Sequence, residues 1–260
     1  MKDALKILLT NDDGIHAPGI HEMAEQLSRQ HEVFVVAPDY EKSATSAAIT
    51  LQHPLRVREF KYHGPAAAKK YFHVNGTPAD CVKIALKVVM KEFGRPDMVI
   101  SGINHGANMG VDVRYSGTVA AAFEGVFAGV PSLAVSSATF GPSPRYDTAA
   151  EFVASRIGVL LKRLREIEAG CLLNINVPSV APAEIKGYRI TRLNNFRYED
   201  SYKEVADPND RAHYWLSGER ILVEEDALTD LVCVRENYVS VTPLQMDQTS
   251  LATLKSLREL

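Results

Sequence analysis

Two adjacent carboxylates, Asp12 and Asp13, follow a short apolar run and directly precede Gly14. Two carboxylates side by side favour a cation, because together they balance the charge of a divalent ion. Ligands that are oxygen only suit hard cations such as Mg²⁺, Mn²⁺ or Ca²⁺. The alternative is that Asp12, Asp13 and Gly14 form a plain turn that caps the following helix. The tripeptide alone leaves both interpretations open.

A second polar segment, SGINHGANMGVDVRYSGTVAAAFEG, spans residues 101–125. Its glycines permit close approach of a ligand to the backbone, and Asn104, Asn108, Ser116 and Thr118 supply hydrogen-bonding groups. A helix that begins near Ser116 would direct its free N–H groups at an anion such as phosphate. Ser116 would serve equally as the cap of that helix. Capping and anion binding are compatible, so the segment remains a candidate phosphate site.

Five other polar residues near these segments have both a structural and a chemical interpretation. His16 and His105 lie in the two loops and invite a role as proton donors, although loop histidines are commonly only solvated. Asp39 and Asp112 fit turn and loop positions better than ligand positions. Asn75 would either touch the site from a third loop or hold the turn before the next helix.

Several well-known motifs are absent from the sequence. It contains no GxGxxG after the first apolar run, no GxxxxGK[ST], no GxSxG and no HExxH. The three cysteines, Cys81, Cys171 and Cys233, lack the spacing of a zinc or redox site. The formal net charge is −3, from 29 basic and 32 acidic residues. This balance provides no basic surface for a nucleic-acid partner.

Near-continuous apolar runs predict strands buried on both faces of a parallel sheet. The runs are residues 6–10, 33–37, 97–102, 132–136 and 172–177, and helical patterns at 18–27, 77–94, 117–131 and 147–167 separate them. This alternation predicts an α/β fold, a three-layer Rossmann-like core with a mostly parallel sheet. Ligands of such folds gather at the carboxyl ends of the strands. We therefore expect Asp12, Asp13 and Asn104 on one rim of the sheet.

The chain from about Gly187 onward has a different pattern. Residues 188–193, 214–218, 220–225 and 237–244 alternate like hairpin strands, 194–213 is long and polar, and 248–260 predicts a helix. We expect residues 1–186 to form the catalytic core and 187–260 a smaller β-rich extension that ends in a helix. The exposed edges of such hairpins need covering, which predicts a homo-oligomer.

The overall composition, 46% hydrophobic and 23% charged, is typical of a water-soluble globular protein. No apolar stretch approaches the about 20 residues of a membrane span. The apolar run near the N-terminus is too short for a secretory signal. We therefore expect a cytoplasmic protein without a membrane partner.

Six blocks of sequence occur in order between about residue 6 and about residue 250. They are ILLTNDDGIHAPGI, VVAPDYEKSATSAAIT, VNGTPADCVKIAL, PDMVISGINHGANMGVDVRYSGTVAAAFEG, LLNINVPSV and SVTPLQMDQT. Together these blocks resemble the survival protein SurE family of metal-dependent 5′/3′-nucleotidases. The resemblance implies a Rossmann-like core, one divalent metal ion such as Mg²⁺ or Mn²⁺, and hydrolysis of nucleoside 5′- and 3′-monophosphates. It also implies homodimers or homotetramers that exchange C-terminal segments, and polyphosphate as a further possible substrate.

The resemblance also assigns roles to individual positions. It implies that the metal ligands are Asp12, Asp13, Ser43 and Asn104, that the phosphate-binding residues are Asn108, Ser116, Gly117 and Thr118, and that Asp12, Asp13 and Asn108 are the catalytic residues. The choice of Ser43 over Thr45 or Ser46 rests on the resemblance alone. The mechanism that the resemblance implies is hydrolysis by a water that the metal would activate. The phosphate-binding residues would hold the phosphate oxygens as charge develops on them.

Two other functions use the same polar residues. A nucleotide- or metal-binding sensor would share most contacts with an enzyme and differ in turnover. A phosphatase with an aspartyl-phosphate intermediate usually needs Asp-x-Asp and a lysine partner, whereas Asp12 and Asp13 are adjacent. The aromatic candidates for stacking a nucleobase, or alternatively for packing a subunit interface, are Tyr115, Phe196, Tyr198 and Tyr202.

Overall fold

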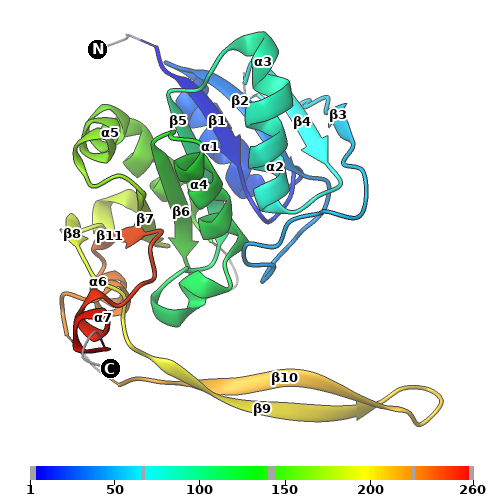
Figure 1. The fold of residues 1–260 in the computed structure, drawn as a ribbon, viewed down its shortest axis with the longest axis vertical. Helices are drawn as coiled ribbons and strands as arrows, with labels where there is room; N and C mark the ends of the chain where they lie inside the picture. Colours follow the sequence, from blue (N-terminus) through cyan, green and yellow to red (C-terminus); the bar gives the residue numbers. More distant parts are fainter. Residues whose placement is uncertain (1–3, 66–67, 140–143, 224–225, 258–260) are drawn as a thin grey trace.

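The computed structural model describes residues 4–65, 68–139, 144–223 and 226–257. Its centre is a nine-stranded sheet in the order β3-β4-β2-β1-β5-β6-β7-β11-β8 (Figure 1). The strands are β1 (Lys6–Thr10), β2 (Glu32–Pro38), β3 (Val57–Glu59), β4 (Lys70–Val74), β5 (Met98–His105), β6 (Ser132–Ala138), β7 (Cys171–Pro178), β8 (Tyr188–Ile190) and β11 (Val239–Gln245). The strands from β4 to β7 in this order are all parallel, while β3 and β11 join them antiparallel. The predicted α/β class and mostly parallel sheet are confirmed.

Helices cover both faces of the sheet and give three layers (Figure 1). The helices are α1 (Pro18–Ser28), α2 (Pro78–Ile84), α3 (Met90–Phe93), α4 (Gly117–Phe127), α5 (Tyr146–Glu166), α6 (Asp230–Arg235) and α7 (Leu251–Leu257). Successive residues of a strand point to opposite faces. Accordingly Ile7 of β1 packs in a core with α1 and α5, whereas Leu8 packs in a second core with α2 and α4. The predicted helix at 77–94 passes through a π-helical turn, Ala85–Val89, between α2 and α3.

Asp80 holds the start of α2 in place. Thr77 is the predicted N-cap and accepts a bond from the Asp80 N–H, while the Asp80 carboxylate accepts from the Thr77 N–H at 3.0 Å. The same carboxylate accepts from the N–H and hydroxyl of Thr50, at 3.0 and 2.6 Å. Burial alone would raise the pKa of Asp80, but these bonds hold it below its usual value.

We expect Asp80→Ala to lower the free energy of unfolding at pH 7 by about 2 kcal/mol, because it removes several charge-assisted hydrogen bonds. The lowered pKa means that the carboxylate stabilises the fold above its unfolded pKa, about 3.9, and that this contribution is lost as the pH falls through the folded pKa. Urea unfolding of wild type and variant at pH 7 measures the loss of unfolding free energy. The same comparison at about pH 3 should give a smaller difference between the two proteins. An unchanged free energy of unfolding at pH 7 would contradict the prediction.

The chain after residue 187 corrects the expected hairpin pattern. Residues 188–193 do not begin a hairpin, because β8 lies parallel to β11, and β11 pairs with β7, so both strands extend the central sheet. The sheet therefore runs across the predicted boundary at 186–187. The separate part is a hairpin of β9 (Arg197–Ala206) and β10 (Ala212–Ile221), which projects as a long ribbon (Figure 1). The long polar segment 194–213 thus contains a strand, the predicted strand at 214–218 lies within β10, and the one predicted at 220–225 overlaps β10 only at residues 220 and 221.

The sequence gives no strand signal for β9, and there is a physical reason. Every residue of β9 is exposed, and so are eight of the ten residues of β10. A strand without a buried face needs no apolar alternation, and its polar composition is typical of a loop.

The predicted C-terminal helix is confirmed as α7, and its last predicted residues, 258–260, lie outside the described residues. Residues 224–225 of the strand predicted at 220–225 also lie outside them. In the described part of the chain, no helix combines the length and apolar character required to cross a bilayer.

Candidate active site

Two neighbouring strands bring the predicted site residues together. Asp12 and Asp13 follow β1, Asn104 lies at the end of β5, and β1 pairs directly with β5. The His105 N–H donates to Asp13 Oδ2 at 3.0 Å, which joins the two loops. The structure therefore brings the two carboxylates and the end of β5 to one rim, as the order of the elements predicts.

The loop after β1 is also a tight turn, so the turn interpretation holds as well. The Asn11 side chain bonds both the carbonyl and the N–H of Gly14, at 2.9 and 3.2 Å. Gly14 has a φ of +95°, and a Cβ there would lie 3.0 Å from the Tyr40 carbonyl carbon. Only glycine meets both requirements without strain. The turn leaves the side chains of Asp12 and Asp13 free to face other elements.

Helix α4 begins against Asp12. Thr118 donates its N–H to Asp12 Oδ2 at 3.0 Å and its hydroxyl to Asp12 Oδ1. The Thr118 hydroxyl also lies 3.4 Å from Asn104 Oδ1. A Cβ on Gly117 would lie 2.9 Å from the Asp12 Cβ, so the close approach needs glycine at that position. The positive end of the α4 dipole thus faces the carboxylate pair.

Burial raises the free energy of ionising the two carboxylates. Asp12 is 4% exposed, and burial raises its pKa against the opposing hydrogen bonds from Thr118. Burial and then the charge of Asp12 raise the pKa of Asp13 to about 7. Glu41, a residue that sequence analysis did not select, adds a smaller effect in the same direction at both. Within the described residues neither carboxylate forms an ion pair with a basic side chain.

Such a pair of carboxylates fits a hard cation, because a divalent ion would offset the charge that the protein leaves uncompensated. The Asn104 carboxamide oxygen lies beside them, across the Thr118 hydroxyl. No three His, Cys, Asp or Glu side chains converge in the described parts of the chain. A metal here would therefore need neutral oxygens, such as those of Asn104 and Ser43, to complete its coordination.

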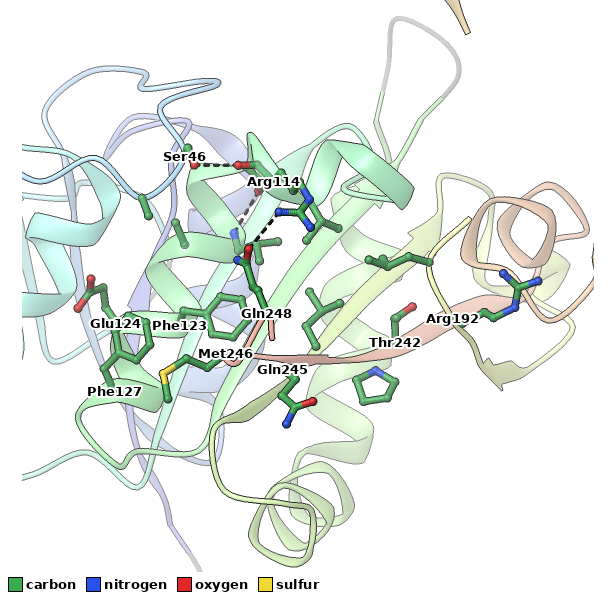
Figure 2. A pocket seen from close by; sticks show the side chains of 18 of the residues that line it. Ser46, Arg114, Phe123, Glu124, Phe127, Arg192, Thr242, Gln245, Met246 and Gln248 are labelled. Atoms are coloured by element: carbon green, nitrogen blue, oxygen red, sulfur yellow. Dashed lines mark hydrogen bonds between the residues drawn. The ribbon is translucent and has the colours of Figure 1, made fainter. Parts of the chain in front are cut away.

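The loop after β2 contains the three candidate hydroxyls. The Lys42 N–H donates to the Asp12 carbonyl at 2.7 Å and holds this loop beside the rim. Thr45 donates its hydroxyl to the Lys42 carbonyl and Ser46 to the Arg114 carbonyl (Figure 2), so both bind backbone. Ser43 is exposed and donates to Glu41 Oε1 at 2.6 Å. Ser43 is thus the one hydroxyl of the three that is tied only to another side chain.

Three of the four phosphate-side candidates, Ser116, Gly117 and Thr118, form the start of α4, whereas Asn108 lies in the loop after β5. Ser116 is the helix cap, since its Oγ accepts from the Val119 N–H at 3.1 Å. Asn108 is buried, with its side chain donating to Ser136 Oγ at 3.0 Å. Thr118 directs both of its donors at Asp12, so its direct contact in this structure is with the carboxylate.

The other polar candidates have structural contacts. His16 lies edge-on to Phe60, at 5.1 Å between ring centroids. Asn75 accepts from the Arg56 N–H at 2.6 Å and thereby joins the turn before α2 to the segment before β3. Asp112 accepts from the Tyr198 hydroxyl at 3.1 Å and from Arg220 at 3.2 Å. The Asp39 N–H donates to the Val74 carbonyl at 2.9 Å.

The aromatic candidates for base stacking divide by exposure. Phe196 is 2% exposed and lies under the Arg220 guanidinium at 4.4 Å, so its faces are not available to a nucleobase. Tyr198 is also exposed but its hydroxyl is bonded to Asp112, whereas Tyr115 and Tyr202 are more exposed still.

Tyr146, the first residue of α5, also reaches the rim and was not among the predicted site residues. Its hydroxyl lies 3.2 Å from His105 Nδ1, and its ring would contact any Cβ added at Gly19. Burial and the charge of Asp13 raise the pKa of Tyr146 to about 12, so it remains a neutral hydroxyl at the rim. The helix predicted from the sequence begins one residue later, at Asp147, so no pattern marks Tyr146 as a site residue.

Comparison with known proteins identifies the family to which the chain belongs. The family model described as "Survival protein SurE" matches residues 7–200, which include the carboxylate pair and the start of α4. The chain belongs to the SurE family.

Relatives in the SurE family match nearly the whole chain. A protein of Natranaerobius thermophilus named "5′-nucleotidase SurE" is 46% identical over 255 residues, 97% of each chain. One of Moorella thermoacetica with the same name is 47% identical over 244 residues, 94% of this chain and 91% of the relative. The crystal structure of the SurE protein of Aquifex aeolicus superposes with a TM-score of 0.82 at 36% identity and covers 98% of both chains.

Proposed function

We propose that the chain is a divalent-metal-dependent 5′-nucleotidase, which hydrolyses nucleoside monophosphates to nucleoside and phosphate. The observation that carries the proposal is the buried carboxylate pair facing the start of α4, without a basic partner among the described residues. Near-full-length relatives named "5′-nucleotidase SurE" support the reaction class. The proposal extends to 3′-monophosphates and, as a side activity, to polyphosphate. We also propose that the protein is located in the cytoplasm.

The residues that would hold the metal are Asp12, Asp13, Asn104 and Ser43. A bound divalent ion supplies Lewis acidity toward a phosphate oxygen and a lower pKa for a coordinated water. The fit rests on the uncompensated carboxylates and on the neutral oxygens around them.

The remaining residues would bind and orient the phosphate. Asn108, Ser116 and the amides at Gly117 and Thr118 would hold its oxygens as charge develops, at the positive end of the α4 dipole. Thr118 would in addition fix the orientation of Asp12 through its two bonds. We assign no base role to Asp13, because a carboxylate bound to a cation has a lowered pKa and is a weak base.

The test is phosphate release from AMP and GMP by metal-stripped protein, repeated after Mg²⁺ or Mn²⁺ is restored. Release that returns with the metal supports the proposal. Metal and nucleotide binding without release would instead favour a sensor. A trapped covalent phosphoenzyme would favour the aspartyl-phosphate mechanism.

We also propose that the chain forms a homo-oligomer, a dimer or a tetramer. An apolar groove of about 570 Å³ lies between α4 and the end of β11, beside Phe123, Phe127 and Met246 (Figure 2). The β9–β10 hairpin is exposed and includes Trp215, 69% exposed. Covering such surfaces with a second copy would remove apolar area from water. Light scattering at micromolar concentration should give at least twice the chain mass of 28.6 kDa, and a monomeric mass would refute oligomerisation.

A further inference from the structure

A cluster of buried polar side chains lies beneath the loop at residues 106–110. Asn174 and Asn176 come from β7 and Ser136 from the adjacent strand β6, and all three are fully buried. Ser136 is the register partner of Asn176. Asn174 and Asn176 are two residues apart and therefore point to the same face of the sheet. All of these side chains converge on one residue of the loop, Asn108.

The cluster binds both the backbone and the side chain of Asn108. The Asn108 N–H donates to Asn176 Oδ1 at 2.8 Å, and Asn176 Nδ2 donates to the Asn108 carbonyl at 3.0 Å. Asn174 Nδ2 donates to the same carbonyl at 2.8 Å. The Asn108 side chain donates to Ser136 Oγ at 3.0 Å. Four hydrogen bonds thus fix one loop residue, and the carboxamide of Asn176 binds it as the backbone of a neighbouring strand would.

Fold stability alone is a poor explanation for this cluster. Two carboxamides in the middle of an otherwise apolar strand carry a desolvation cost unless every polar atom is paired. Within the described residues, Asn174 Oδ1 has no hydrogen-bond partner. Apolar side chains, such as those of Leu173 and Ile175 in the same strand, fill a core without this cost. The polar residues do what apolar ones cannot, which is to fix the peptide orientation of Asn108.

We infer that Asn176 and Asn174 are positioning residues of the active site, with Ser136 as the anchor of the Asn108 side chain. They hold the 106–110 loop so that Asn108 faces the phosphate in a fixed orientation. The inference rests on the proposed function for the identity of the bound phosphate. It assigns a role to residues of β6 and β7 that lie beneath the rim and contact neither Asp12 nor Asp13 by hydrogen bond among the described residues.

Asn176→Asp is the sharpest test, because it keeps the shape and the acceptor for the Asn108 N–H but removes the donor. A carboxylate oxygen would then face the Asn108 carbonyl. We expect kcat/KM for AMP to fall about 30-fold, mainly through KM, because a displaced phosphate-binding group weakens both binding and orientation. Inhibition by inorganic phosphate should weaken about tenfold. Mn²⁺ binding measured by calorimetry should stay within about threefold of wild type, since the carboxylate ligands are outside the cluster.

A buried charge at position 176 also lowers stability, so Ser136→Ala is made in parallel. It removes only the acceptor of the Asn108 side chain and should raise KM and the inhibition constant of phosphate several-fold. The matched control is Thr148→Val, which removes the bond from the buried Thr148 hydroxyl of α5 to the Val180 carbonyl, at 2.7 Å. The control should lower the unfolding temperature and leave both constants unchanged.

The outcomes separate this inference from the proposed function. An active wild type, with Asn176→Asp and Ser136→Ala that lose only stability as the control does, would overturn the positioning role. A wild type that releases no phosphate would overturn the proposed function instead. In that case, binding of inorganic phosphate measured by calorimetry still decides the positioning role, because the variants should bind it more weakly than the control.

Discussion

Replacing Asp12 by Asn should reduce phosphate release from AMP by roughly a thousandfold and leave the protein folded. The variant removes one of the two charges that would hold the metal, and the loss of several kcal/mol of Lewis-acid stabilisation corresponds to about three powers of ten in rate. The shape at position 12 is unchanged, and the remaining carbonyl oxygen still accepts from the Thr118 N–H. Rate loss should therefore not be accompanied by unfolding.

The thermal stability of Asp12→Asn provides a second, independent test of the metal site. Asp12 is a buried carboxylate with an uncompensated charge, so a neutral carboxamide should make the metal-free protein at least as stable as wild type. Mn²⁺ should raise the unfolding temperature of wild type by preferential binding to the folded state, and it should do so much less in the variant. Thermal unfolding with and without Mn²⁺ measures both.

Asp39→Asn is the matched control for Asp12→Asn. Asp39 also follows a strand of the parallel sheet, β2, but its N–H bonds the Val74 carbonyl of β4 and we assign it no ligand role. The control should keep wild-type activity within about twofold. Full turnover by Asp12→Asn, or an equal loss in Asp39→Asn, would mean that the metal centre lies elsewhere.

The sequence was sufficient to predict that the site residues meet at one rim. Asp12 and Asp13 follow one buried run, and Asn104 ends another. The carboxyl ends of neighbouring parallel strands share an edge whatever the loops do. The structure pairs the two strands directly. The position of α4 was predictable for the same reason, because its start follows the β5 loop and Ser116 has the chemistry of a cap.

The residues that contact the site loops from β7 and α5 were not predictable in this way. Asn174 and Asn176 lie within an apolar run that correctly predicts a buried strand, and a strand pattern does not say what a buried polar side chain contacts. Their partner, Asn108, is more than 60 residues away in the chain, at 2.8 Å from Asn176. Tyr146 reaches the rim because α5 packs against α1, which is a tertiary contact. Such positions follow from the packing of the layers.

Replacing Gly117 by Ala should lower kcat/KM for AMP by at least about 100-fold, because the start of α4 would have to move away from Asp12. A Cβ at this position would lie 2.9 Å from the Asp12 Cβ, 3.0 Å from its Oδ2 and 3.1 Å from the Pro78 Cγ. Contacts under 3 Å to a buried side chain are relieved only by displacement. A displacement of about 1 Å at a catalytic site costs about two powers of ten in rate. Steady-state kinetics on AMP measures the loss.

Gly158→Ala separates the effect of position from the effect of alanine itself. Gly158 lies within α5, and an added Cβ there has no atom within 4 Å. Alanine in a helix is more stable than glycine by about 1 kcal/mol, so this control should stabilise the protein and keep its activity. In Gly117→Ala the same gain in helix propensity competes with the clash against Asp12. A variant at position 117 with wild-type kinetics would show that the close contact between α4 and Asp12 is not needed for turnover, and that Thr118 orients Asp12 across a wider gap.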